Sequence, residues 1–209
     1  MSPALAKIKN CTTTQFRPLL NMHPLISKCF IETNSSDERV KSDALVDLSF
    51  VLEMNTRGLS QEEKRDKYSH YVPADLVEIE PIEKELTEIV SFLENKLEKG
   101  EISAIEFFPL LRNTSASLAL IPVINALKNP EISFDEDTLY QALASLEKLL
   151  FWTNDLSFEH IKSLVEENRL GKIIARFVFK MSPISQEKLN SLCTLLLSKL
   201  AYIDEMSDE

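Results

Sequence analysis

The sequence has little glycine: Gly58, Gly100 and Gly171 are the only three in 209 residues, and each lies at the edge of an apolar-periodic stretch. Sheet-rich folds need many tight turns with positive φ, which glycine adopts most easily. Glycine-rich phosphate loops also need several glycines at fixed spacing. The scarcity of glycine therefore favours an all-α fold and excludes the common nucleotide-binding motifs.

The sequence also lacks clustered metal-binding or nucleophilic residues. Its three cysteines are odd in number and far apart, which is typical of a reducing compartment, and its three histidines are isolated from them and from one another. The glutamates between residues 75 and 106 alternate with apolar residues at helical spacing, so they are expected on a solvated face rather than in a catalytic cleft. We expect no metal, no cofactor and no enzymatic activity.

No window approaches the roughly 18 consecutive apolar residues of a membrane span, and the first ten residues have no continuous apolar core. We therefore expect neither a signal peptide nor a contact with a membrane. The net charge of −10 and the pI near 4.9 disfavour sequence-independent binding of nucleic acid, which requires positive charge. Protein partners are the remaining expectation, in the nucleus or alternatively in the cytoplasm.

Apolar residues recur at steps of three and four along most of the chain, with capping patterns at Ser60 to Glu63 and Ser133 to Glu136. This pattern predicts short antiparallel helices, arranged as an irregular bundle or as an armadillo- or HEAT-like stack. The predicted organisation is an irregular arm over 1–35, a helical region over 36–132, a helical bundle over 133–203 packed on it, and an acidic tail over 204–209.

A basic stretch stands out in this acidic chain, since Arg169, Lys172, Arg176 and Lys180 fall three or four residues apart and share one helix side. One interpretation is a patch that binds acidic peptides or nucleic acid. The other is an ordinary solvated face whose charge is balanced by the acidic first half of the chain. Upstream of it, Trp152 ends an apolar stripe and is predicted to lie in the core rather than at a binding surface.

The last third combines a leucine-striped helix, a Leu-Ser turn, a Leu-Gly-Lys step into an apolar helix, and a final leucine-rich helix. The residues that make this pattern are Leu143, Leu146, Leu149, Leu156, Ser157, Ile161, Leu170, Gly171, Lys172, Ile173, Ile174, Phe177, Leu189, Leu192, Cys193 and Leu196. Residues 137–203 thereby resemble the TFIIS N-terminal (LW) domain family. Two positions depart from the family pattern: Leu200, not Trp, follows Lys199, and Met181, not His, follows Lys180.

The resemblance implies a non-enzymatic nuclear adaptor that docks short motifs of transcription-elongation or chromatin proteins. It further implies a basic rim around the helix 172–180, made by Arg169, Lys172, Arg176 and Lys180, with Phe177 beneath them. The main alternative is an armadillo- or HEAT-like scaffold, or a subunit of a stable cytosolic or nuclear complex, in which the leucine pattern is convergent. A helical enzyme without recognisable motifs, or a nucleic-acid binder, is a third hypothesis.

Overall fold

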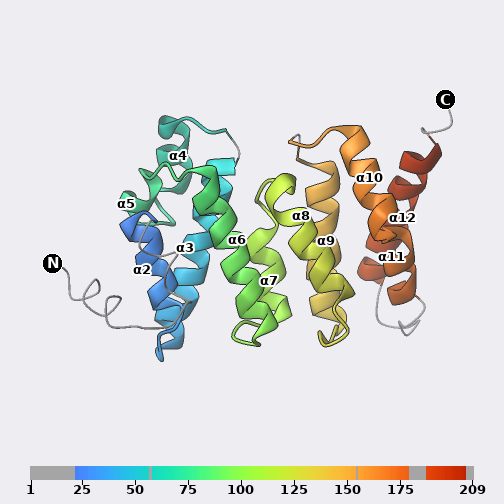
Figure 1. Cartoon of the computed structure of the whole chain (residues 1–209), viewed down its shortest axis with the longest axis horizontal. Coiled ribbons are helices and arrows are strands. Elements are labelled where there is room, and N and C mark those ends of the chain that lie inside the picture. The colour runs from blue at the N-terminus through green and yellow to red at the C-terminus, as the bar shows by residue number, and fades with distance from the viewer. Residues whose placement is uncertain (1–21, 57, 154, 179–186, 206–209) are drawn as a thin grey trace. The chain divides into compact units, whose positions relative to one another are not determined.

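The computed structural model describes residues 22–56, 58–153, 155–178 and 187–205. Every regular element within these ranges is a helix, and none of them is a strand, which confirms the predicted all-α fold (Figure 1). The helices are α2 (Pro24–Glu32), α3 (Glu38–Thr56), α4 (Gln61–Tyr68), α5 (Ala74–Val77), α6 (Glu83–Glu98), α7 (Ala104–Leu111), α8 (Ala116–Lys128), α9 (Glu136–Phe151), α10 (Phe158–Asn168), α11 (Leu170–Val178) and α12 (Glu187–Glu205).

The chain divides into two compact units, residues 1–92 and residues 93–209, and the division falls within α6. The predicted boundary near residue 133 does not coincide with this division. The reason lies in the packing of α9, which contacts both α7 and α8 as well as α12. α7 and α8, which precede residue 133, therefore belong to the same core as α9 and α12.

In the N-terminal unit, α2 lies against α3 (Figure 1). The sequence predicted an irregular arm over 1–35, but Pro24–Glu32 forms a helix. Proline suits the first position of a helix, because the backbone N–H that it lacks would have no partner there. Ile26 and Phe30, four residues apart, are fully or almost fully buried, and the Phe30 ring stacks on Phe92 with centroids 4.0 Å apart. Residues 1–21 of the predicted arm lie outside the described residues.

The helix α4 has the N-terminal cap that the sequence predicts, and it also packs against α3. The Ser60 side chain accepts from the Glu63 backbone N–H and the Glu63 carboxylate accepts from the Ser60 N–H, as the sequence predicted. The capping pattern alone does not indicate which residues of this helix pack against α3. Tyr68 is buried and its hydroxyl donates to Glu53 of α3 over 2.9 Å, and the buried Lys64 ammonium donates to Asn55 of α3.

In the C-terminal unit, the apolar side of α9 is the part of the core that α7, α8 and α12 share. Its predicted leucine stripe is confirmed, with Leu143, Leu146 and Leu149 fully buried. The helix begins differently from the prediction, because Asp135 rather than Ser133 is the N-cap. The Asp135 carboxylate accepts from the Thr138 N–H over 2.8 Å, which is the same capping geometry two residues later.

The turn between α10 and α11 also differs from the prediction. The sequence places Gly171 at the edge of an apolar-periodic stretch, but it lies inside α11 and does not have a positive φ. The chain turns at Arg169 instead, which adopts the left-handed conformation with φ 52° and ψ 45°. A left-handed residue with a side chain is strained by about 1 kcal/mol or more, so the stabilising contacts around it have to offset that strain.

Exchanging glycine for alanine at two positions separates these roles. At both Gly171 and Gly100 an added Cβ has no neighbour within 4 Å, but Gly100 has a φ of +66°. We expect Gly171→Ala to raise the free energy of unfolding by about 0.5 kcal/mol, because alanine favours the helix. We expect Gly100→Ala to lower it by about 1 kcal/mol. Urea denaturation measures both; equal destabilisation by the two changes would contradict the turn described here.

A half-buried carboxyl group makes the stability of the α2–α3 pair depend on pH. Burial, and then the nearby carboxylates of Asp43 and Glu32, raise the pKa of Asp47 to about 6, against an opposing effect of Lys28. The folded protein therefore binds this proton more tightly than the unfolded chain does. The stabilisation is complete below the unfolded pKa of about 3.9 and is lost as the pH rises through about 6.

We accordingly expect Asp47→Asn to be more stable than the unmodified protein above about pH 6, with the difference in melting temperature vanishing towards about pH 4. Thermal melts followed by circular dichroism across this range measure it. Asp66→Asn, at an exposed position of α4, removes the same charge and serves as the control. A pH-independent difference for Asp47→Asn, or the same profile for both variants, would refute the assignment.

Candidate functional site

The described part of the chain contains two cysteines and residues of the other types that can bind a metal ion. No group of three or more His, Cys, Asp or Glu residues is placed to hold a metal ion within it. Burial, together with the carboxylates of Asp47 and Glu32, raises the pKa of the Cys29 thiol to about 12, and burial also raises the pKa of Cys193. Both thiols therefore stay protonated at neutral pH. Among the helices described, none is both long and apolar enough to cross a membrane.

Two surfaces of the C-terminal unit gather side chains suited to binding a partner. The first lies where α8, α10 and α11 meet. We term it the basic corner: Lys128, Arg169, Lys172 and Arg176, all exposed. Two hydrogen bonds connect the end of α8, where Lys128 lies, with α10 and α11. The Lys128 ammonium donates to the Asn168 side chain over 2.6 Å, and the Arg176 guanidinium donates to the Leu127 carbonyl over 3.4 Å.

The cations of the basic corner have no counter-ion among the described residues. Among the residues described, no carboxylate lies within ion-pair distance of Lys128, Arg169, Lys172 or Arg176. The two nearest acidic residues in sequence are engaged along α10 itself. Glu166 pairs with Lys162 over 3.7 Å, and Glu167 accepts from the Ser163 hydroxyl over 2.6 Å. The positive charge of the corner is therefore not compensated locally.

Phe177 lies below this surface and belongs to the core. It is only 6 % exposed, and its ring makes an edge-to-face contact with Phe134 at a centroid separation of 5.2 Å. The Arg176 guanidinium lies 5.2 Å from the same ring, so the aromatic face supports the cation from beneath. Lys180, the fourth cation of the predicted rim, lies outside the described residues.

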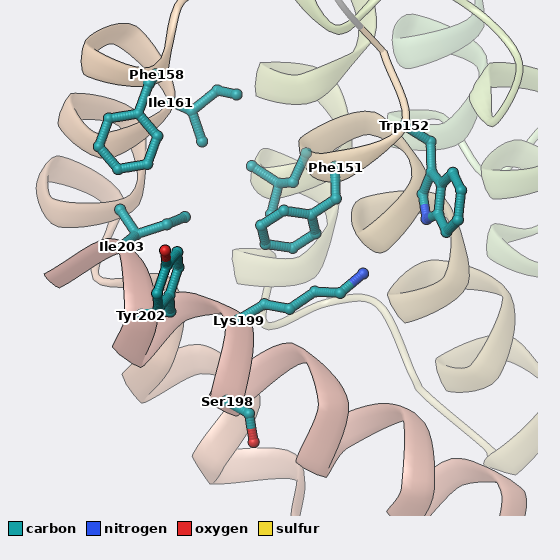
Figure 2. A pocket seen from close by; sticks show the side chains of 9 residues that line it. Phe151, Trp152, Phe158, Ile161, Ser198, Lys199, Tyr202 and Ile203 are labelled. Atoms are coloured by element: carbon teal, nitrogen blue, oxygen red, sulfur yellow. The ribbon is translucent and has the colours of Figure 1, made fainter. Parts of the chain in front are cut away.

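The second surface is a groove of about 580 Å³ at the end of α9, between α10 and α12. We term it the aromatic groove: Leu150, Phe151, Trp152, Phe158, Ile161, Ser198, Lys199, Tyr202 and Ile203. Phe158 and Ile161 come from α10, and Tyr202 and Ile203 from α12 (Figure 2). Three of its rings are strongly exposed for aromatic side chains: Trp152 by 70 %, Tyr202 by 61 % and Phe158 by 40 %.

Lys199 and Glu147 organise one end of the groove. The Lys199 side chain extends past Phe151 towards Trp152 (Figure 2), with its ammonium 4.7 Å from the Phe151 ring centroid and 5.5 Å from that of Trp152. The Glu147 carboxylate accepts from this ammonium and, over 2.9 Å, from the Trp152 indole N–H. One carboxylate thus fixes both the cation and the indole, and it neutralises the charge of Lys199.

The exposure of Trp152 corrects the prediction that it lies in the core. The sequence showed an aromatic pair at the end of an apolar stripe, and only its first member, Phe151, is partly buried. Trp152 is the C-cap of α9 with φ −121° and ψ 0°, so the helical periodicity that would have turned its ring inward stops there. Glu147, five residues earlier, is the signal in the sequence that could have indicated an outward indole with a bonded N–H.

A long-range helix cap positions the chain that follows Trp152. The Asp155 carboxylate accepts from the backbone N–H groups of Ala116 (3.2 Å) and Ser117 (2.8 Å) at the start of α8. Desolvation raises the pKa of Asp155, but these donors outweigh it and hold the pKa below its ordinary value. The segment between α9 and α10, which borders the aromatic groove, is therefore attached to the first turn of α8.

Comparison with models of protein families, with curated proteins and with solved structures found no match for this chain.

Removing the Asp155 cap tests how the groove is held in place. We expect Asp155→Ala to lower the free energy of unfolding by about 1–2 kcal/mol. Two N–H groups of α8 lose their acceptor, and the helix dipole loses its favourable interaction with the carboxylate charge. Asp155→Asn keeps an acceptor oxygen and should lose less. The penalty of Asp155→Ala should shrink in acid, since the pKa of Asp155 is lowered and its contribution disappears as the pH falls through the folded value.

Chemical denaturation measures the stability of both variants. The emission of Trp152, the only tryptophan of the chain, reports the local effect. Unchanged stability of Asp155→Ala at neutral pH would show that the cap does not hold the two segments together.

Proposed function

We propose that the protein is a non-enzymatic interaction adaptor whose C-terminal unit binds a short acidic segment of a partner protein at the basic corner. The observation that supports this proposal is the absence of a carboxylate partner for Arg169, Lys172 and Arg176 among the described residues, in a chain with a net charge of −10. An acidic protein has many carboxylates with which to compensate its cations, so an uncompensated cluster is a specific feature.

The N-terminal unit provides the contrast. There the arginines and lysines typically pair with carboxylates, as Arg65 does with Glu78 and Lys28 with Glu32. At the basic corner Arg176 uses one N–H for the Leu127 carbonyl, and no described carboxylate takes up the remaining guanidinium N–H groups of Arg169 and Arg176. Arginine forms two parallel hydrogen bonds with a carboxylate, which adds geometric selectivity to the charge attraction. An acidic segment would also approach this corner faster than it would approach the rest of the negative surface.

The resemblance of residues 137–203 to the TFIIS N-terminal domain family supports a particular kind of partner. In that family a basic rim accompanies the docking of short disordered motifs, and Arg169, Lys172, Arg176 and Lys180 occupy the corresponding stretch of this sequence. We therefore propose a nuclear role, with the acidic segment supplied by a transcription-elongation or chromatin protein. The adaptor would hold that protein without acting on it chemically.

An armadillo- or HEAT-like subunit of a stable complex is the second candidate, and one observation favours it. The outer face of α12 between Lys188 and Tyr202 carries no charged exposed residue: Asn190, Ser191, Thr194, Leu195, Ser198, Ala201 and Tyr202. A face of this kind can be covered by another subunit. Monodisperse behaviour of the isolated chain in analytical ultracentrifugation would count against this candidate, whereas self-association would favour it.

Charge reversal tests the leading proposal. We expect Lys172→Glu/Arg176→Glu to bind a capped, labelled Asp/Glu-rich peptide at least about tenfold more weakly than the unmodified protein, since two charge pairs of roughly 1 kcal/mol each are lost. Binding by the unmodified protein should weaken as salt is added, and binding by the variant should be nearly insensitive to salt. Fluorescence anisotropy measures both effects, and circular dichroism shows whether the variant is folded.

The matched control is Arg39→Glu/Lys84→Glu in the N-terminal unit, where both side chains are at least 71 % exposed. It changes the net charge by the same amount, and we expect it to keep the affinity within about twofold. An equal loss in both variants would reduce the effect to overall charge. No loss in either variant would refute the basic corner as the binding site.

A further inference from the structure

We propose that the aromatic groove is a second docking site and that it binds a proline-rich segment in the polyproline II conformation. This site is distinct from the basic corner, because the two lie at opposite ends of α10: Phe158 is its first residue and Arg169 is its C-cap. The proposal does not depend on what binds the basic corner. Three features of the groove determine the choice of ligand.

The first feature is the set of exposed rings. Trp152, Phe158 and Tyr202 come from the α9 end, α10 and α12 respectively, so the groove is lined by aromatic side chains from three directions (Figure 2). Aromatic-lined grooves bind proline-rich segments because the flat proline ring stacks on them and because the segment is already extended before it binds, which lowers the entropic cost.

The second feature is the hydrogen-bonding capacity that remains in the groove, which includes the Lys199 ammonium and the Tyr202 hydroxyl as donors, with only the hydroxyl oxygens of Ser198 and Tyr202 as acceptors. Within the described residues the Tyr202 hydroxyl makes no hydrogen bond, and Lys199 makes one, to Glu147, which leaves ammonium N–H groups available. The Glu147 carboxylate, the nearest strong acceptor, already receives the Trp152 indole and Lys199. A ligand rich in acceptors and poor in donors therefore matches the groove best.

A polyproline II segment meets this requirement, because its carbonyl groups make no internal hydrogen bonds and its prolines have no N–H. A helical ligand uses its carbonyls internally and would leave the donors of the groove unmatched. An ordinary extended segment brings an N–H group at every residue, more than the two hydroxyl oxygens of the groove can accept, and each unmatched N–H that is buried costs free energy.

The third feature is the balance of charge. Lys199 is neutralised by Glu147, and Lys162, on the neighbouring turn of α10, pairs with Glu166 over 3.7 Å. An acidic segment would gain little from a cation that is already paired, and it would face the Glu147 carboxylate. Uncharged carbonyl oxygens match the groove better, so its ligand differs chemically from the ligand of the basic corner.

Trp152 allows a direct test, because it is the only tryptophan and lies in the groove. The full-length protein is titrated with a capped oligoproline peptide while the selectively excited tryptophan emission is recorded. We expect a saturable change in emission, and no such change with a capped Gly/Ser peptide of equal length, an amphipathic helical peptide or an Asp/Glu-rich peptide. Titration calorimetry measures the affinity independently.

Variants of Tyr202 separate the hydrogen bond from the ring. We expect Tyr202→Phe to weaken oligoproline binding about 3- to 10-fold through loss of one donor, and Tyr202→Ala to weaken it further. Neither change should unfold a protein in which this side chain is 61 % exposed. Tyr71→Phe, at a tyrosine of the N-terminal unit that is 72 % exposed, is the matched control and should bind as the unmodified protein does.

Three results would overturn the inference: no saturable change with oligoproline up to about 1 mM, an affinity of Tyr202→Phe equal to that of Tyr71→Phe, or a larger emission change with the helical or acidic peptide. Its failure is distinguishable from failure of the acidic-segment proposal. Lys172→Glu/Arg176→Glu should bind oligoproline normally, and Tyr202→Ala should bind the Asp/Glu-rich peptide normally.

Discussion

Burial of the apolar side of α9 is the constraint on which the C-terminal unit depends. Leu143, Leu146 and Leu149 are fully buried, and α7, α8 and α12 all pack on this helix. Each such leucine contributes on the order of 2 kcal/mol by leaving water, and the three neighbouring helices are held in register by the same side chains. Both candidate surfaces follow from this packing, because the aromatic groove forms where α9 ends and the basic corner forms where α8 ends before α9 begins.

The two surfaces differ in how their cations are treated. Lys199 is paired with Glu147 and stands beside two rings, so its charge organises the groove without attracting an anion. At the basic corner Arg176 instead reaches the last turn of α8, where a cation is favoured by the free carbonyls. The two surfaces therefore differ in whether a described carboxylate accompanies the cations, in a chain whose net charge is −10.

Local patterns in the sequence predicted local structure well. The capping box at Ser60 and the stripe of α9 follow from the spacing of a few neighbouring residues, which is why periodicity and capping rules apply to them. The errors arose where two local solutions compete. Asp135 and Ser133 are both residue types that can cap α9, and the structure uses Asp135. Glycine adopts the left-handed conformation most easily, yet between α10 and α11 the left-handed residue is Arg169 and not Gly171. A local rule has no means of choosing between such neighbours.

The sequence by itself determined that the chain is helical, where its major helices run and which of their sides are apolar, because these properties depend on contacts within a few residues. It also placed Arg169, Lys172 and Arg176 on one basic stretch. Only the tertiary structure decided that Lys128 joins them, that no described carboxylate pairs with them, and that Trp152 is exposed and lines the same groove as Tyr202. These facts depend on residues dozens of positions apart, whose proximity is set by the packing of helices and not by any spacing along the chain.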